Sequence, residues 1–183
     1  MEPRQLSREL REGRSAELTR RRWTLGLSLF GAAMGGIVSL YQMGILRRLP
    51  DPPPKKLFDA SRVDASDYAY KRLNMPDGPM MVATYAATAM LASAGGKERA
   101  RDNPALPLAL AAKALYDSVT ALKLAREEWA ENRALCAYCQ AATLASFASV
   151  ALAAPEAARA ARTLLDGDAR PAGGRSRRHR RRG

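Results

Sequence analysis

WTLGLSLFGAAMGGIVSLYQMGIL, the stretch from Trp23 to Leu46, contains no charged side chain. At 1.5 Å of rise per residue, a helix of this length crosses the roughly 30 Å hydrocarbon core of a bilayer. Arginines stand directly before and after it, at Arg22 and Arg47, as is typical of membrane segments. The run is longer than the apolar part of a signal peptide, and no Ala-x-Ala site follows it. We therefore predict a transmembrane helix that is retained in the protein.

Three further apolar stretches follow, at residues 79–96, 105–125 and 134–154, the last closed by Pro155. Each is close to the length of a membrane span, and none has the alternating pattern of a strand. We expect an all-α fold, a four-helix transmembrane bundle with a long polar loop, residues 47–78, between helices 1 and 2. The expected organisation is a charged N-terminal arm at 1–22, a membrane domain at 23–155 and a basic, disordered tail at 156–183.

The charge of the chain is concentrated outside the apolar stretches. Lys and Arg number 30 against 18 Asp and Glu, for a formal net charge of +12. By the positive-inside rule, the basic residues at 20–22, 97–101 and 175–182 favour cytoplasmic termini in a bacterial inner membrane. We interpret the basic tail as a contact with anionic membrane lipid and expect no nucleic-acid partner. The alternative is a single-span anchor with a helical domain and a nucleic-acid-binding tail.

Two spacings within the apolar stretches suggest helix contacts. Gly31 and Gly35 form a Gly-x-x-x-Gly pattern, which permits close helix packing but is also frequent by chance in Ala- and Gly-rich helices. Lys113 and Asp117 are four residues apart and would share one helix face, away from lipid. They are either a structural ion pair or part of a proton or substrate path.

The candidate chemistry resides in Cys136 and Cys139, the only cysteines of the chain. At this spacing on a helix both thiols share a face, and a helix N-terminus favours the thiolate that acts in disulfide exchange. A c-type haem would need histidine at position 140, which is Gln140, and zinc would need about four ligands, whereas the only histidine is His179. We predict a redox-active dithiol without metal or haem; two unrelated buried thiols are the other interpretation.

The cysteines and the loop together resemble the vitamin K epoxide reductase family, across about residues 23–155. The motif from Leu135 to Cys139 (LCAYC) opens the last span, as the family's redox motif does. The loop stretch from Ser61 to Tyr68 (SRVDASDY) is similar to the family's Ser-Lys/Arg-Val-x-x-Ser pattern, and Met75-Pro76 precedes the second span.

The resemblance implies a membrane thiol–quinone oxidoreductase that exchanges two electrons between thiols or disulfides and a bound quinone. Cys139 would face the quinone, Cys136 would exchange with the external thiol, and Ser66 would line the quinone pocket. The chain departs from the family by lacking the loop cysteine pair: Ala60 stands where one cysteine is expected. A thioredoxin-like thiol protein would then act directly on the pair. The alternative is a non-catalytic family member, a membrane scaffold or small-molecule binder.

Overall fold

The computed structural model describes residues 2–54 and 56–168, and this part of the chain is helical without a β-strand. Its elements in chain order are α1 (Pro3–Glu12), α2 (Ala16–Gln42), α3 (Ala60–Asp64), the 3-10 helix η1 (Asp67–Ala69), α4 (Asp77–Ser93), α5 (Arg99–Asp102), α6 (Ala105–Asn132) and α7 (Ala137–Asp168). The all-α expectation is confirmed for these residues. Most of the expected tail, residues 169–183, lies outside them.

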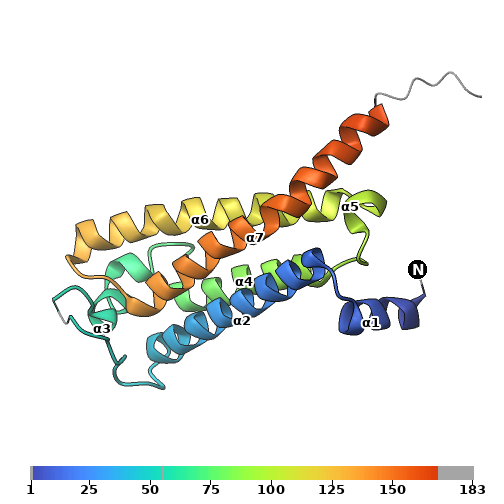
Figure 1. Ribbon diagram of the computed structural model, residues 1–183. Coiled ribbons are helices and arrows are strands. Elements are labelled where there is room, and N and C mark those ends of the chain that lie inside the picture. Colours follow the sequence, from blue (N-terminus) through green and yellow to red (C-terminus); the bar gives the residue numbers. More distant parts are fainter. Residues whose placement is uncertain (1, 55, 169–183) are drawn as a thin grey trace, which may run out of the picture.

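The four longer helices α2, α4, α6 and α7 pack side by side (Figure 1). Helix α2 contacts α4 and α7, and α6 contacts α7 and α4. Three of them, α2, α6 and α7, are long and apolar enough to cross a membrane, whereas α4 has 17 residues and is the shortest of the four. Large apolar side chains such as Leu29, Leu115 and Leu144 remain exposed on the outer surface, as lipid contact requires.

The first apolar helix begins earlier than its hydropathy predicts. We expected it to start at Trp23, but α2 starts at Ala16, where the Ser15 side chain accepts a hydrogen bond from the amide of Leu18. The three arginines at 20–22 therefore belong to the helix. Arg21 is buried and donates to four main-chain carbonyls at the end of α4, those of residues 92 and 94–96, at 2.9–3.0 Å. Its guanidinium satisfies carbonyls that the helix end leaves without partners.

The last helix does not end at Pro155, as we expected, but continues to Asp168 and extends beyond the bundle (Figure 1). Proline inside a helix removes one hydrogen bond and costs about 3 kcal/mol. The next residue, Glu156, forms a buried, two-pronged ion pair with Arg99, at 2.7 and 2.8 Å. Arg99 also donates to the carbonyls of Leu91 and Ala94. This pair ties the continuation of α7 to the α4–α5 turn.

The Gly-x-x-x-Gly pattern lies at the contact between α2 and α4. A Cβ atom at Gly31 would come within 2.5 Å of the Tyr85 ring, and one at Gly35 within 2.7 Å of the Cβ of Met81. Gly36, the next residue, faces open space. The small residues therefore set how closely α4 approaches α2, and α4 carries part of the cavity wall described below.

We expect Gly35→Ala to lower the free energy of unfolding by about 1–3 kcal/mol, because the added methyl group overpacks the α2–α4 contact. The matched control is Gly36→Ala, which should be neutral or slightly stabilising, since alanine favours helix and meets no neighbour there. Thermal unfolding in detergent micelles measures both. Equal midpoints for the two variants would contradict the close contact.

Candidate functional site

A site forms at the end of the bundle where the segment between α2 and α4 folds over the start of α7. The amide of Leu135 donates to the carbonyl of Leu57, and the amide of Asp59 donates to the carbonyl of Leu135, at 2.9 and 3.1 Å. Nearby, the Tyr138 hydroxyl donates to the carbonyl of Pro50, and Arg62 donates to the carbonyl of Asn132. The segment is thereby fixed over the cysteine motif by main-chain and side-chain hydrogen bonds.

Both cysteines are free thiols, and they differ in exposure. Cys136 directly precedes α7 and is 0% exposed. Its sulfur accepts a hydrogen bond from the amide of Cys139, at 3.2 Å, in the manner of a helix N-cap. Cys139 lies in the first turn of α7, and its side chain forms part of a cavity wall. The expectation that the pair opens the last helix is therefore met, with one thiol behind the other as seen from the cavity.

Burial has a larger effect on the pKa of the Cys136 thiol than the helix N-terminus has. We expected the N-terminus to favour the thiolate, but removal from water raises the pKa of the Cys136 thiol above its ordinary value, and the hydrogen bonds from Cys139 offset this only in part. A buried thiol of this kind requires a proton acceptor before it can react as a thiolate.

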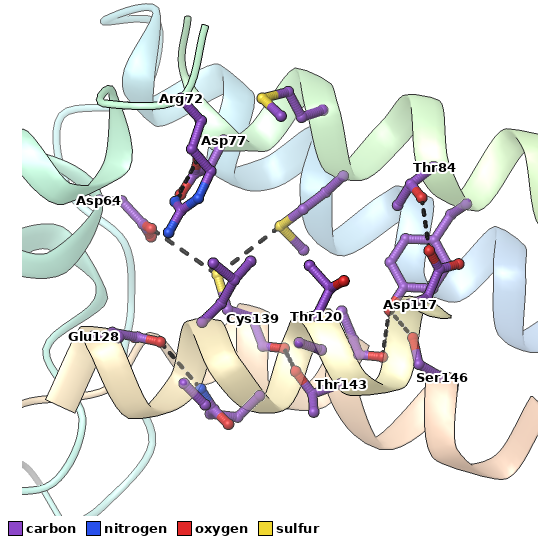
Figure 2. A pocket seen from close by; sticks show the side chains of 18 of the residues that line it. Asp64, Arg72, Asp77, Thr84, Asp117, Thr120, Glu128, Cys139, Thr143 and Ser146 are labelled. Carbon is purple, nitrogen blue, oxygen red and sulfur yellow. Dashed lines mark hydrogen bonds and ion pairs between the residues drawn. The ribbon is translucent and has the colours of Figure 1, made fainter. Parts of the chain in front are cut away.

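Two buried carboxyl groups flank the pair. Asp64, at the end of α3, accepts a hydrogen bond from the Cys139 thiol at 4.0 Å, and Figure 2 shows the two side chains pointing toward each other. Glu128, on α6, accepts hydrogen bonds from the amide of Cys136 and from the Gln140 side chain. Neither residue belongs to the candidate set that the sequence predicts. Asp64 lies inside the quoted loop pattern, but nothing in the sequence indicates that it is buried.

The cavity beside Cys139 has a volume of about 330 Å³, at the lower end of the range for small-molecule sites. Its wall is mostly apolar, with Met80, Met81 and Leu124 among the residues that form it. Polar side chains also reach it, including Asp64, Arg72, Thr84, Asp117 and Thr120 (Figure 2). An apolar wall with few polar groups suits a small, largely apolar ligand that carries a few polar atoms.

Arg72 closes the loop side of the cavity. Its guanidinium pairs with Asp77 of α4 and Glu127 of α6, at 3.2 and 3.0 Å, and lies over the ring of Tyr68, 4.7 Å from the centroid. The Tyr68 hydroxyl in turn donates to the carbonyl of Leu124 on α6. This network joins the loop to two helices at the cavity, and its contacts to α6 connect residues more than 50 positions apart in sequence.

Lys113 and Asp117 form the ion pair that their spacing predicts. Both contact the hydroxyl of Thr84 on α4, so the pair joins α4 and α6 inside the bundle. Asp117 also reaches the cavity wall. The pair is therefore structural and at the same time borders the space in which a ligand would bind.

Ser66 lies outside the set of described residues that form the cavity wall. Its hydroxyl donates to the carbonyl of Val63, at 2.6 Å, and its neighbours Val63, Asp64 and Tyr68 line the cavity instead. Ala60, where the family resemblance calls for cysteine, is fully buried in the same apolar cluster as Cys136. The loop thus packs against Cys136 without a thiol of its own.

Asp64, Cys136 and Cys139 could together face a metal ion, because their ligand atoms all lie within 4.8 Å of one another. Among the described residues, no other set of three or more His, Cys, Asp or Glu side chains is grouped in this way. A closed structural zinc site uses four such ligands, so this set is one short. The same proximity allows a proton to pass between the Asp64 carboxyl and either thiol, and it places the two sulfurs close enough to form a disulfide.

Comparison with known proteins identifies one family. The model of the vitamin K epoxide reductase family matches residues 22–154. The comparisons with curated proteins and with solved structures each gave no significant match. The matched range contains α2 from Arg22 onward, α4, α6, the part of α7 up to Ala154, the loop and both cysteines.

The stability of the protein should depend on pH through Asp64. Burial, with smaller contributions from Asp77 and Asp51, raises the pKa of this carboxyl to about 7, against about 3.9 in an unfolded chain. The folded state therefore binds the proton more tightly, and the resulting stabilisation is complete below about pH 4 and lost as the pH rises through 7. Between about pH 4 and pH 7, the free energy of unfolding should fall by on the order of 2–4 kcal/mol through this group.

Asp64→Asn should remove this dependence, so the variant should unfold at a higher temperature than the wild type at pH 8 and at a similar temperature at pH 4–5. Thermal unfolding in micelles at both pH values measures the difference. The exposed Asp67→Asn variant is the control and should follow the wild type. Parallel pH profiles for Asp64→Asn and wild type would contradict a buried, neutral Asp64.

Proposed function

Because the chain belongs to the vitamin K epoxide reductase family, a family of membrane redox proteins, we propose that it is a thiol–quinone oxidoreductase that works through Cys136 and Cys139. The observation that carries the proposal is the position of Cys139 in the wall of an apolar cavity, with Cys136 directly behind it. In this reaction two thiols become one disulfide, and the quinone takes up two electrons and two protons.

The cavity has the chemistry that a quinone requires. Its ring would contact Met80, Met81 and Leu124, while its carbonyl oxygens would accept hydrogen bonds from donors such as Thr120 and Arg72. Ser66 remains a proposed substrate-binding residue. Since its hydroxyl bonds to Val63, we assign it an indirect contribution, through the conformation of the loop that lines the cavity.

We propose four membrane spans, with α4 as the fourth, and cytoplasmic termini in a bacterial inner membrane. Arg21 contacts the carbonyls of residues 94–96, so the basic segments at 20–22 and 97–101 lie at one end of the bundle. The positive-inside rule assigns this end to the cytoplasm. The cysteines at the opposite end then face the oxidising side, where disulfide chemistry proceeds.

Cys139→Ser should abolish thiol-dependent quinone reduction in native membranes, because no sulfur remains at the cavity wall. In the wild type, alkylation followed by gel shift should show the pair turning to disulfide when quinone is added and to dithiol when quinone is depleted. Ser93→Ala, an exposed change on α4, controls for expression. Undiminished turnover in Cys139→Ser would reject the proposal, and thiols that stay reduced with quinone present would favour a non-catalytic binder.

The external thiol partner, proposed to be a thioredoxin-like protein, must reach a cysteine that the loop covers. Cys136 is fully buried beneath it, and the Arg62 guanidinium ties α3 to the end of α6. We therefore propose that the partner acts on a state in which the loop is lifted, a local opening of the fold.

Arg62→Ala should speed labelling of Cys136 by a membrane-impermeant maleimide about tenfold, because one charge-assisted hydrogen bond no longer holds the loop. The reagent is added outside intact spheroplasts, and mass spectrometry identifies the labelled cysteine. Arg48→Ala, an exposed arginine of the same loop, should leave the rate unchanged. Labelling only after the cells are opened would contradict the proposed orientation, and equal rates in both variants would contradict the loop as the barrier.

A further inference from the structure

Asp64 faces both thiols of the redox pair from the loop side of the cavity. Its side chain is 2% exposed, and one carboxylate oxygen lies 4.0 Å from the Cys139 sulfur. The sulfur of Cys136 also lies within 4.8 Å of a carboxylate oxygen of Asp64. The main-chain carbonyl of Asp64 accepts a hydrogen bond from Gln42 at the end of α2, so the residue is anchored to the bundle.

The second carboxylate oxygen, Oδ2, has no hydrogen-bond partner among the residues that the structure describes, although it is buried. Buried polar atoms are nearly always paired, and an exception calls for an explanation such as a role in catalysis. Asp64 lines the cavity together with Cys139, so this carboxyl borders the place where the proposed quinone would react. The geometry is that of a proton acceptor next to a nucleophile.

We propose that the carboxyl group of Asp64 is the acid–base catalyst of this dithiol, serving first Cys139 and then Cys136. This proposal rests on the function proposed above and adds the residue that moves the protons. The family resemblance assigned no role to this position.

The sequence of proton transfers balances the overall reaction. The Cys139 S–H bond breaks, its proton passes to the Asp64 carboxylate, and the sulfur attacks the quinone ring with the electron pair that it keeps. Asp64 then gives that proton to one quinone oxygen and accepts the proton of Cys136. The Cys136 sulfur attacks the Cys139 sulfur, the S–S bond forms, and the bond between Cys139 and the ring breaks with its electron pair on the ring. The second proton passes from Asp64 to the other oxygen, which completes the hydroquinone.

The surroundings of Asp64 fit this use. The acidic groups that face it are Asp51 of the loop, Asp77 of α4 and Glu128 of α6, and the two thiols face it from the α7 side. Burial, reinforced by Asp77 and Asp51, raises the pKa of Asp64 to about 7. A general base works best with a pKa near the working pH, because it then both accepts and returns protons.

The test follows Cys139 alkylation by iodoacetamide in reduced native membranes from pH 5 to 9, with mass spectrometry to separate the two cysteines. In the wild type the rate should rise in a step with a midpoint near pH 7, where Asp64 becomes able to accept the proton. Asp64→Asn keeps the size of the side chain and should lose this step, with a rate at least about tenfold lower at pH 7.5. Asp64→Glu restores a carboxyl and should recover the step, while the exposed Asp67→Asn should behave as wild type.

Quinone turnover provides the second measurement. Asp64→Asn should lower kcat by on the order of 100-fold at pH 7.5, with a much smaller change in KM, because proton transfer and not quinone binding is impaired. An Asp64→Asn variant that keeps both the pH step and wild-type kcat would overturn the role of Asp64 and leave the proposed function standing. The opposite result is also informative, in which the wild type shows the Asp64-dependent pH step in Cys139 alkylation but no quinone turnover. That result would support the acid–base role and reject quinone as the substrate.

Discussion

Two main-chain hydrogen bonds, between Leu135 and the loop residues Leu57 and Asp59, hold the loop against the cysteine end of the bundle. They bind the loop to the turn that precedes α7, and everything at the site follows from that attachment. Cys136 becomes buried, Asp64 is carried to within reach of both sulfurs, and Tyr68 and Arg72 close the cavity.

The two ends of the bundle use buried charge in different ways. At the end opposite the cysteines, Arg21 and Arg99 satisfy the carbonyls at the end of α4, and Glu156 neutralises Arg99. Each of these three buried charges has hydrogen-bond partners, which is the condition for burying ions without a large penalty. At the thiol end, Asp64 keeps one oxygen without a partner among the described residues. The first arrangement stabilises the fold, and the second leaves a group free to exchange protons.

The loop without cysteines alters how electrons would reach the buried pair. Ala60 packs in the apolar cluster around Cys136, so the loop retains its covering position but offers no sulfur for an internal relay. The cavity gives a small ligand access to Cys139, whereas a protein must displace the loop to contact Cys136. The two substrates of the proposed reaction would therefore approach from different sides, and only one approach requires the fold to open.

The sequence alone predicted apolar helices long enough for a membrane, a cysteine pair at the start of the last helix, and the family. Charge-free runs such as 23–46 identify membrane segments because a bilayer excludes charge. The three-residue spacing of Cys136 and Cys139 predicts that their side chains lie close together. Local rules were less reliable at helix ends. Pro155 did not stop α7, and the buried pairing of Arg99 with Glu156 ties its continuation to the bundle. Helix α2 began at Ala16, ahead of the apolar run, because Ser15 caps it there.

Only the tertiary structure decided which residues meet the thiols. Asp64 lies 75 residues from Cys139 in sequence, and Glu128 belongs to the preceding helix, α6. Nothing in the local sequence pattern distinguishes a buried carboxyl group from a solvated one. Ser66, which the loop pattern favoured, hydrogen-bonds within the loop, while its neighbours line the cavity. Burial, and with it the raised pKa of Asp64, depends on the packing of the loop against α7, a property that arises only when distant parts of the chain come together.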